Sequence, residues 1–399
     1  FAEYWMKYLS GHWYAEYSFC TYNLQRGLRP PISGAFQNYF VDEMGSPIRS
    51  EIWACVSPAD PQLAAMMAWM DSSLDHTGGE GRWGEMFWAA VESAAFVIKD
   101  VKTLVNIGLS MIPISSNISR VIREVLHCHE IGMRWDELRE RIATVFGHHQ
   151  PCNAIPNHGF TIIGLLYGKN FGDKLCKAVN CGYDTDCTGA TLGSLLGIMN
   201  GASMIPEKWR KPVGDAIVPC RQTVTEGLPK SLGELTQRTV TVAQDFISKR
   251  SEDVEFGDET YIQDDVLSWL YRNEKVRDLL TFDDHCAVEN LGDLEVIFHY
   301  GGEPVLHPEI RRMFEVSLTK NGRSTEGEVN VEGPPEWEIS NPILEDGRHR
   351  FDILAKHVEN RNKIEVAIRL DDKIHKVDFT ILGPDGIRGV LAASAAPKG

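Results

Sequence analysis

The chain has 399 residues, of which 43% are hydrophobic and 24% charged, an ordinary composition for a globular protein. This length suggests two domains, with ample sequence for a sizeable core. The net charge of −16 argues against a nucleic-acid partner or an acidic membrane surface, because binding to phosphates needs a basic face. No apolar run approaches the roughly 20 residues that span a bilayer.

Nine cysteines follow no repeating spacing, so we read them as reduced thiols. The default expectation is therefore a cytoplasmic protein. Secretion stays open as an alternative, because the chain does not begin with Met.

The first 250 residues read as helices. Residues 1–28 form one or two aromatic-rich helices, and the absence of a capping residue before Phe1 suggests that the sequence begins inside a domain. Asp60 and Pro61 are typical of the first positions of a helix. Further helical patterns cover residues 85–98, 117–129, 135–146, 160–167, 171–179 and 232–248. We therefore expect an all-α domain over residues 1–250.

The most informative stretch is residues 180–201. Gly182 ends one helix, Asp184 lies in the turn, and Asp186 is expected to cap the next helix. Two acids at a buried helix start are costly unless a cation pairs them, and Mg²⁺ prefers carboxylate and hydroxyl oxygens. The alternative is a plain cap with an Asx-turn and no metal. Glycines at every fourth position from Gly189 to Gly201 predict a close approach of another backbone.

The last third of the chain changes period. Residues 251–285 read as an acidic helical linker. Residues 286–385 then alternate with period two and carry turn residues between the runs, which predicts a β-sandwich. The expected strands are residues 294–300, 313–318, 328–331, 349–354, 363–368 and 376–381. No chemical motif is visible in this domain.

Residues 182–190, Gly-Tyr-Asp-Thr-Asp-Cys-Thr-Gly-Ala, resemble the final signature of the ADP-ribosylglycohydrolases, a family that includes the dinitrogenase reductase-activating glycohydrolase and the ADP-ribosylarginine and ADP-ribosylserine hydrolases. The resemblance implies an all-α fold that holds two Mg²⁺ ions, with Mn²⁺ as an alternative. It makes Asp184 and Asp186 metal ligands and catalytic residues. The Thr that usually follows is Cys187 here, so we expect Thr188 as a substitute third metal ligand.

Two further segments resemble the substrate loops of that family. Residues 44–49 (Met-Gly-Ser-Pro-Ile-Arg) resemble its phosphate loop, which implies that Gly45, Ser46 and Arg49 hold the diphosphate. The alternative for Arg49 is a structural ion pair. His76 matches a histidine that touches ADP-ribose, and its alternative is a hydrogen bond within its own turn.

The family's upstream Thr-Asp-Asp motif and catalytic Glu are not recognisable in residues 1–399. The resemblance implies a Mg²⁺-dependent hydrolase that cleaves the glycosidic bond between ADP-ribose and a protein side chain or small acceptor. Two alternatives stay open: a divergent enzyme for another glycoside or nucleoside, and a non-catalytic binding or structural protein that retains the fold.

Overall fold

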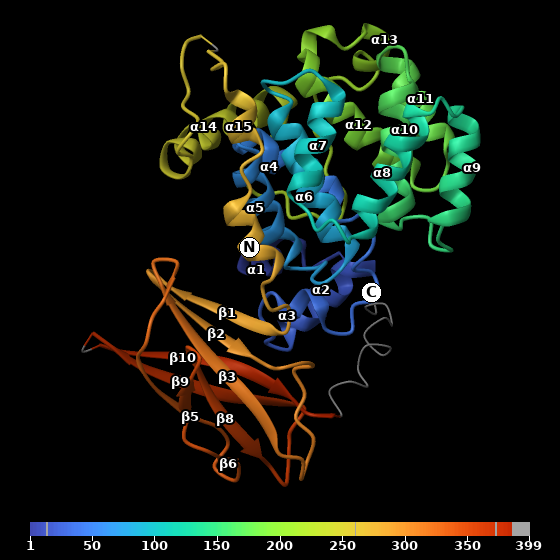
Figure 1. Ribbon diagram of the computed structural model, residues 1–399. Helices are drawn as coiled ribbons and strands as arrows, with labels where there is room; N and C mark the ends of the chain where they lie inside the picture. The colour runs from blue at the N-terminus through green and yellow to red at the C-terminus, as the bar shows by residue number, and fades with distance from the viewer. Residues whose placement is uncertain (13–14, 260, 372, 385–399) are drawn as a thin grey trace. The chain divides into compact units, whose positions relative to one another are not determined.

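The computed structural model describes residues 1–12, 15–259, 261–371 and 373–384. The chain divides into two compact units, and neither is a single continuous stretch of sequence. The strand unit comprises Phe1–Tyr39, Ser73–Thr77 and Asp283–Gly399, and the helical unit comprises Phe40–Ser72 and Gly78–Phe282. Figure 1 follows the chain through the helices and then through the strands.

The helical unit consists of α-helices with two short 3-10 turns, as the sequence pattern predicts. Several helices begin at a side-chain cap, such as Asn153, which accepts the backbone N–H of Ile155. The elements are η2 (Pro47–Arg49), α4 (Ser50–Val56), α5 (Pro61–Ser72), α6 (Glu80–Ala94), α7 (Val101–Ser110), α8 (Asn117–Glu130), α9 (Trp135–Val145), α10 (Ala154–Tyr167), α11 (Phe171–Asn180), α12 (Thr185–Asn200), η3 (Ala202–Met204), α13 (Glu207–Arg210), α14 (Leu232–Arg250), α15 (Val266–Leu270) and α16 (Glu274–Leu280).

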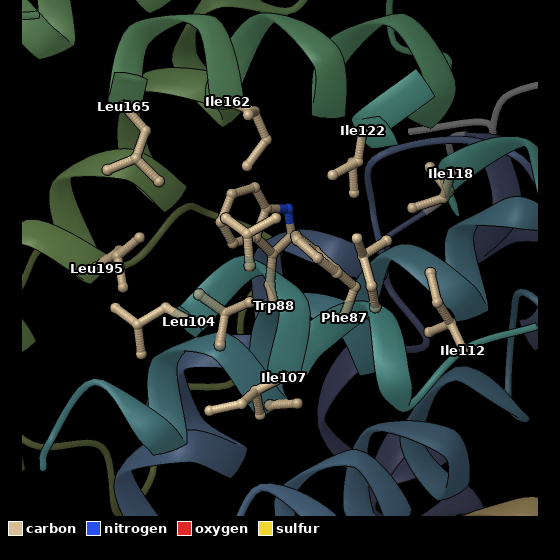
Figure 2. Packing of buried hydrophobic residues seen from close by; sticks show 14 of the residues in the cluster. Phe87, Trp88, Leu104, Ile107, Ile112, Ile118, Ile122, Ile162, Leu165 and Leu195 are labelled. Carbon is tan, nitrogen blue, oxygen red and sulfur yellow. The ribbon is translucent and has the colours of Figure 1, made fainter. Parts of the chain in front are cut away.

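Helix α6 is the centre of this unit. Its aromatic pair, Phe87 and Trp88, is fully buried, with ring centroids 4.9 Å apart in an edge-on arrangement. Figure 2 shows the side chains of other helices around this pair: Leu104, Ile107, Ile118, Ile122, Ile162, Leu165 and Leu195. Because almost every face of α6 is covered, its glutamates Glu85 and Glu92 also lie in the interior. A buried carboxyl group needs partners, and those partners shape the site described below.

The strand unit contains two antiparallel sheets. The larger sheet has the order β1-β2-β3-β8-β6, with β4 paired to β3 and β7 paired to β8, and the smaller sheet has the order β10-β9-β5. The strands are β1 (Cys286–Leu291), β2 (Leu294–His299), β3 (Arg312–Lys320), β4 (Arg323–Ser324), β5 (Glu328–Glu332), β6 (Glu338–Ile339), β7 (Ile343–Glu345), β8 (Arg348–Leu354), β9 (Arg361–Leu370) and β10 (Lys373–Leu382). Phe298 of the larger sheet stacks on Phe379 of the smaller one at 5.0 Å, so the two sheets share one core, as a sandwich requires.

The N-terminal segment folds onto this sandwich. It contributes α1 (Ala2–Tyr4), a π-helix η1 (Trp5–Leu9), α2 (Ala15–Gln25) and α3 (Ile32–Ala35). Leu28, Ile32 and Phe36 belong to the sandwich core. The N–H of Val288 donates to the Pro30 carbonyl over 3.0 Å, which adds a backbone tie. Residues from both ends of the sequence therefore build one core.

The expected fold class, an all-α region followed by a small all-β region, is confirmed. The six strands expected from the sequence correspond to β2, β3, β5, β8, β9 and β10, while β1 and three short strands were not expected. The expected domain limits of 1–250, 251–285 and 286–385 stay a prediction. The two compact units group the residues differently, since residues 1–39 and 73–77 belong with the strands. Among the described residues, no helix has the length and apolar character needed to cross a membrane.

Candidate functional site

The turn between α11 and α12 brings two carboxylates to the start of a helix. Gly182 and Tyr183 both adopt positive φ angles, +81° and +63°, which turn the chain sharply before α12. Asp184 occupies the N-cap position, and its side chain makes no capping hydrogen bond. Its backbone N–H donates instead to Oδ1 of Asn157 over 3.1 Å. The expected cap at Asp186 is wrong by two residues, since Asp186 already lies within the first turn of α12.

Three side chains of this turn converge. Carboxylate oxygens of Asp184 and Asp186 and the Sγ of Cys187 lie within 4.8 Å of one another. Ligands that share one cation at 2.0–2.3 Å are at most about 4.6 Å apart, so small adjustments suffice to bind an ion here. Asp184 is only 7% exposed, and its Oδ2 accepts no hydrogen bond from the described residues. A divalent cation bound here would satisfy this buried carboxylate oxygen.

Burial is the main cause that raises the pKa of Asp184, and the Asp186 charge adds to the increase. A hydrogen bond from the Cys187 thiol opposes the increase. Burial also raises the pKa of Cys187, with the Asp184 hydrogen bond as the second cause. Burial thus disfavours the charged forms of Asp184 and Cys187, and a bound divalent cation would oppose that effect.

The Thr188 hydroxyl has a hydrogen-bond partner within its own helix. Its side chain is buried, and its hydroxyl donates to the Thr185 carbonyl over 3.2 Å within the same helix. The expectation that Thr188 is a third ligand stays a prediction. The thiol of Cys187 is the group that the structure brings to the two carboxylates.

A second loop is fixed beside this turn. The N–H of Met44 donates to the Cys152 carbonyl over 2.9 Å, and the N–H of Ala154 donates to the Asp42 carbonyl over 2.7 Å. The side chain of Cys152 lies close enough to hydrogen-bond to Asp184. The turn η2, which follows the loop, packs against α12. The structure thus brings Gly45, Ser46 and the acidic pair, all predicted as site residues, into one region of the helical unit.

Arg49 holds this loop from within. Its Nε donates to Oδ2 of Asp71 over 2.8 Å, and its Nη1 donates to the Gly45 carbonyl over 2.9 Å. Both side chains of the ion pair are largely buried. The geometry corresponds to the alternative that the sequence left open, a structural ion pair. A role in binding phosphate stays a prediction.

Glu85 contacts the Gly45 loop, a contact that the sequence did not indicate. The Ser46 hydroxyl donates to its Oε2, and the Trp53 indole N–H donates to its Oε1 over 2.9 Å. Burial, followed by the nearby Asp71 charge, raises the pKa of Glu85 well above its ordinary value. The only sequence signal was a glutamate directly before the apolar run Met86-Phe87-Trp88.

His76 lies in the strand unit, on the segment Ser73–Thr77. Its side chain is buried, and Nδ1 lies 2.9 Å from Oδ1 of Asp75. Nε2 lies 3.9 Å from Oε1 of Glu16. The structure therefore surrounds His76 with carboxylates of its own unit. Contact with a substrate stays a prediction.

The glycines of α12 do not meet another backbone. A Cβ added at Gly189 would lie 3.3 Å from a Val179 methyl group, and one at Gly193 would lie 3.8 Å from a Leu175 methyl group. These are contacts with side chains of α11. The expectation of a close backbone approach is therefore wrong, and α12 is half-buried on several faces instead of buried all round.

Comparison with protein families decides the relationship. The family model for ADP-ribosylglycohydrolase matches residues 2–244. The chain belongs to the ADP-ribosylglycohydrolase family. No curated protein and no solved structure matched the chain. The ADP-ribosylglycohydrolase match includes the acidic turn, the Gly45 loop and the segment with His76, and it ends before the strands begin.

Membership of the ADP-ribosylglycohydrolase family implies a divalent metal, and the residues can be tested against it. The unsatisfied Oδ2 of Asp184 and the neighbouring Asp186 carboxylate suit a divalent cation. The third group, a thiol, is not a donor that Mg²⁺ favours. The residues therefore fit a divalent cation in general, with a donor set that differs from the one the resemblance implies.

Proposed function

We propose that this protein is a hydrolase that cleaves the glycosidic bond between ADP-ribose and a protein side chain or small acceptor. The observation that carries the proposal is the buried, unsatisfied Oδ2 of Asp184 beside the Asp186 carboxylate, in the same unit as the Gly45 loop. Family membership supports glycohydrolase chemistry, and the acidic pair is the group in the described residues best suited to it.

Asp184 and Asp186 would hold the metal. A divalent cation bound there supplies Lewis-acid and template effects on the hydroxyls of a ribose and on a water molecule. The two carboxylates would be held in place by the rigid α11–α12 turn and by the hydrogen bond from the Asp184 N–H to Asn157. Positioning of this kind is a major part of the catalytic effect when a reactive group must be aligned.

The Gly45 loop would hold the diphosphate. Ser46 and Gly45 can offer backbone N–H groups to an anion, and Arg49 fixes the loop through the Gly45 carbonyl. The net charge of −16 gives no general attraction for an anionic substrate, so local donors of this loop would have to supply the recognition.

The test is release of ADP-ribose from ADP-ribosylated arginine and ADP-ribosylated serine peptides with Mg²⁺, Mn²⁺ or Zn²⁺ present. Asp184→Asn and Asp186→Asn should each lower kcat/KM by at least about 100-fold, because a lost metal ligand removes transition-state stabilisation. Asp245→Asn is the matched control: Asp245 is exposed on α14 and pairs with Lys249, so its removal should leave activity unchanged.

The same assay distinguishes the alternatives. Cleavage of a nucleoside or another glycoside, without release of ADP-ribose, would favour a divergent enzyme. No turnover with any of the three metals, combined with unaltered ADP-ribose binding in the Asp186→Asn variant, would overturn the catalytic proposal and leave a binding protein.

A further inference from the structure

The candidate cation site contains a sulfur atom in addition to carboxylate oxygens, whereas a Mg²⁺ site would contain only oxygen ligands. Cys187 follows Asp186 directly in α12, and its Sγ lies within 4.8 Å of the carboxylate oxygens of Asp184 and Asp186. All three groups come from one rigid turn and the first turn of a helix, so their spacing is fixed by local geometry.

A second thiol lies next to this set. Cys152 interacts with both Asp184 and Cys187, and its backbone carbonyl accepts the N–H of Met44 in the Gly45 loop. Cys152 is exposed, whereas Cys187 is half-buried. The candidate cation position is therefore bordered by two carboxylates and two sulfur atoms from two separate loops.

Donor type decides which cation such a site prefers. Mg²⁺ binds oxygen ligands in an octahedron and is reluctant to lose water, whereas thiolates select Zn²⁺ and other soft cations. Catalytic zinc sites have three protein ligands and one open position, and Zn²⁺ binds carboxylate oxygen, imidazole nitrogen and thiolate sulfur at 2.0–2.3 Å. Asp184, Asp186 and Cys187 make up such a three-ligand set.

We propose that this site binds Zn²⁺ in preference to Mg²⁺, through Asp184, Asp186 and Cys187, with Cys152 as an adjacent thiol. The proposal depends on the proposed function only for the location of the site. On binding, the Cys187 sulfur forms a bond to Zn²⁺ and its proton passes to solvent, because a coordinated thiol is deprotonated. The unsatisfied Oδ2 of Asp184, in a side chain that is 7% exposed, gains the partner that it lacks among the described residues.

The experiment measures metal binding directly. Metal-free protein is titrated with Co²⁺ as a spectroscopic probe, and the bound Co²⁺ is then displaced with Zn²⁺ or Mg²⁺. We expect a thiolate-to-Co²⁺ charge-transfer band, loss of that band on addition of stoichiometric Zn²⁺, and no displacement by a 1,000-fold excess of Mg²⁺.

Three cysteine variants show which sulfur atom binds the metal. Cys187→Thr should abolish the charge-transfer band and weaken Zn²⁺ binding by at least about 10-fold, since losing even a hydrogen-bond partner of a metal ligand typically costs that much. Cys152→Ser is the second variant, and because Cys152 is exposed it should fold; it should retain the band and shift its position or lower the Zn²⁺ affinity. Cys176→Ser, at another exposed cysteine on the neighbouring helix α11, should change nothing.

A Co²⁺ complex without a charge-transfer band, or Mg²⁺ that displaces Co²⁺ at equal concentration, would overturn the proposal. Unchanged Zn²⁺ affinity in folded Cys187→Thr protein would do the same. These outcomes are independent of the hydrolase proposal, because a Mg²⁺-loaded enzyme could still release ADP-ribose. Conversely, a protein that binds Zn²⁺ through Cys187 but hydrolyses nothing would leave the metal inference intact.

Discussion

A Cβ atom on Gly84 would lie 2.5 Å from Cε1 of His158, so α6 and α10 reach their present separation only because residue 84 has no side chain. The His158 ring is fully buried beside Trp88, with ring centroids 5.8 Å apart, and its Nδ1 lies 2.7 Å from the Ala154 carbonyl oxygen. Helix α10 also carries Asn157, which positions Asp184. The packing of these two helices therefore determines where the acidic pair lies.

Gly84→Ala should destabilise the protein by about 1–3 kcal/mol, the usual cost of forcing extra volume into a packed interior. The matched control is Gly193→Ala, another helix-interior glycine whose added Cβ would lie 3.8 Å from its nearest neighbour. That control should be neutral or stabilise by up to about 1 kcal/mol, because alanine favours the helix. Urea unfolding measures both, and equal effects of the two substitutions would contradict the steric argument.

The pH dependence of stability should contain a contribution from His158. Burial lowers the pKa of His158 to about 4, against an ordinary value of 6.5. Between those two values the unfolded chain takes up a proton and the folded chain does not, so stability is lost as pH falls from 6.5 towards 4. The loss is at most about 3 kcal/mol. A folded His158→Asn variant should lack this part of the decline when unfolding is followed by denaturant titration at pH 7, 6, 5 and 4.

Arg49 and Asp71 should be energetically coupled. Asp71→Asn leaves the largely buried Arg49 charge without its partner, and Arg49→Lys keeps the charge but loses the guanidinium geometry that reaches Asp71 and the Gly45 carbonyl together, so each should destabilise by about 1–3 kcal/mol. The double variant should cost clearly less than the sum of the two, by at least about 0.5 kcal/mol. Additive effects in a double-mutant cycle would show that the ion pair does not hold the loop.

Glu85 should be replaceable by glutamine. Because its pKa is raised in the folded state, Glu85 lowers stability as pH rises above the ordinary value of 4.5, since the unfolded chain then releases a proton more readily. Glu85→Gln removes that penalty and keeps an oxygen for the Trp53 indole. Thermal unfolding at pH 8 should show this variant at least as stable as wild type, whereas Glu85→Ala should be less stable by about 1–3 kcal/mol.

In the strand unit, the contact between Asp283 and His299 should stabilise the folded protein. Oδ2 of Asp283 lies 2.7 Å from Nδ1 of His299, whose Nε2 lies 2.9 Å from the Ser317 hydroxyl oxygen. The His299 hydrogen bond lowers the pKa of Asp283, so this contribution is present above pH 3.8 and is lost as pH falls through the lower folded value. Asp283→Asn should cost about 1–2 kcal/mol at pH 7 and less at pH 3. The control is Asp293→Asn: Asp293 is exposed, and its Oδ2 lies 4.0 Å from Nζ of Lys320. This substitution should change the free energy of unfolding little.

Local patterns in the sequence were enough to predict most of the helices, six strands and the closeness of the two acidic residues, whereas α7 was not expected. Asp184, Asp186 and Cys187 lie within four consecutive residues, so one turn of chain brings them together. The alternation of apolar and polar residues likewise predicted β2 and β3, because such a pattern extends over only a few neighbouring residues. Even so, the expected N-cap of α12, Asp186, lies two residues after the observed one, Asp184.

The parts that could not be predicted depend on distant residues. Cys152 is tied to the Met44 loop by backbone hydrogen bonds and also interacts with Asp184, and nothing near Cys152 in the sequence signals either contact. Glu85 meets Ser46 across 39 positions, and Asp283 meets His299 across 16. Such partners are determined by tertiary packing, which a pattern in one segment does not contain.

Leu28, Ile32 and Phe36 are buried among strands that begin at residue 286, so this early segment cannot complete its packing until the end of the chain has been synthesised. During translation these apolar side chains must wait, exposed or held by a chaperone, while some 250 residues of intervening sequence leave the ribosome. A stop codon placed after the last helix would leave these side chains without the strands that cover them, so we expect a truncated chain of that length to fold poorly.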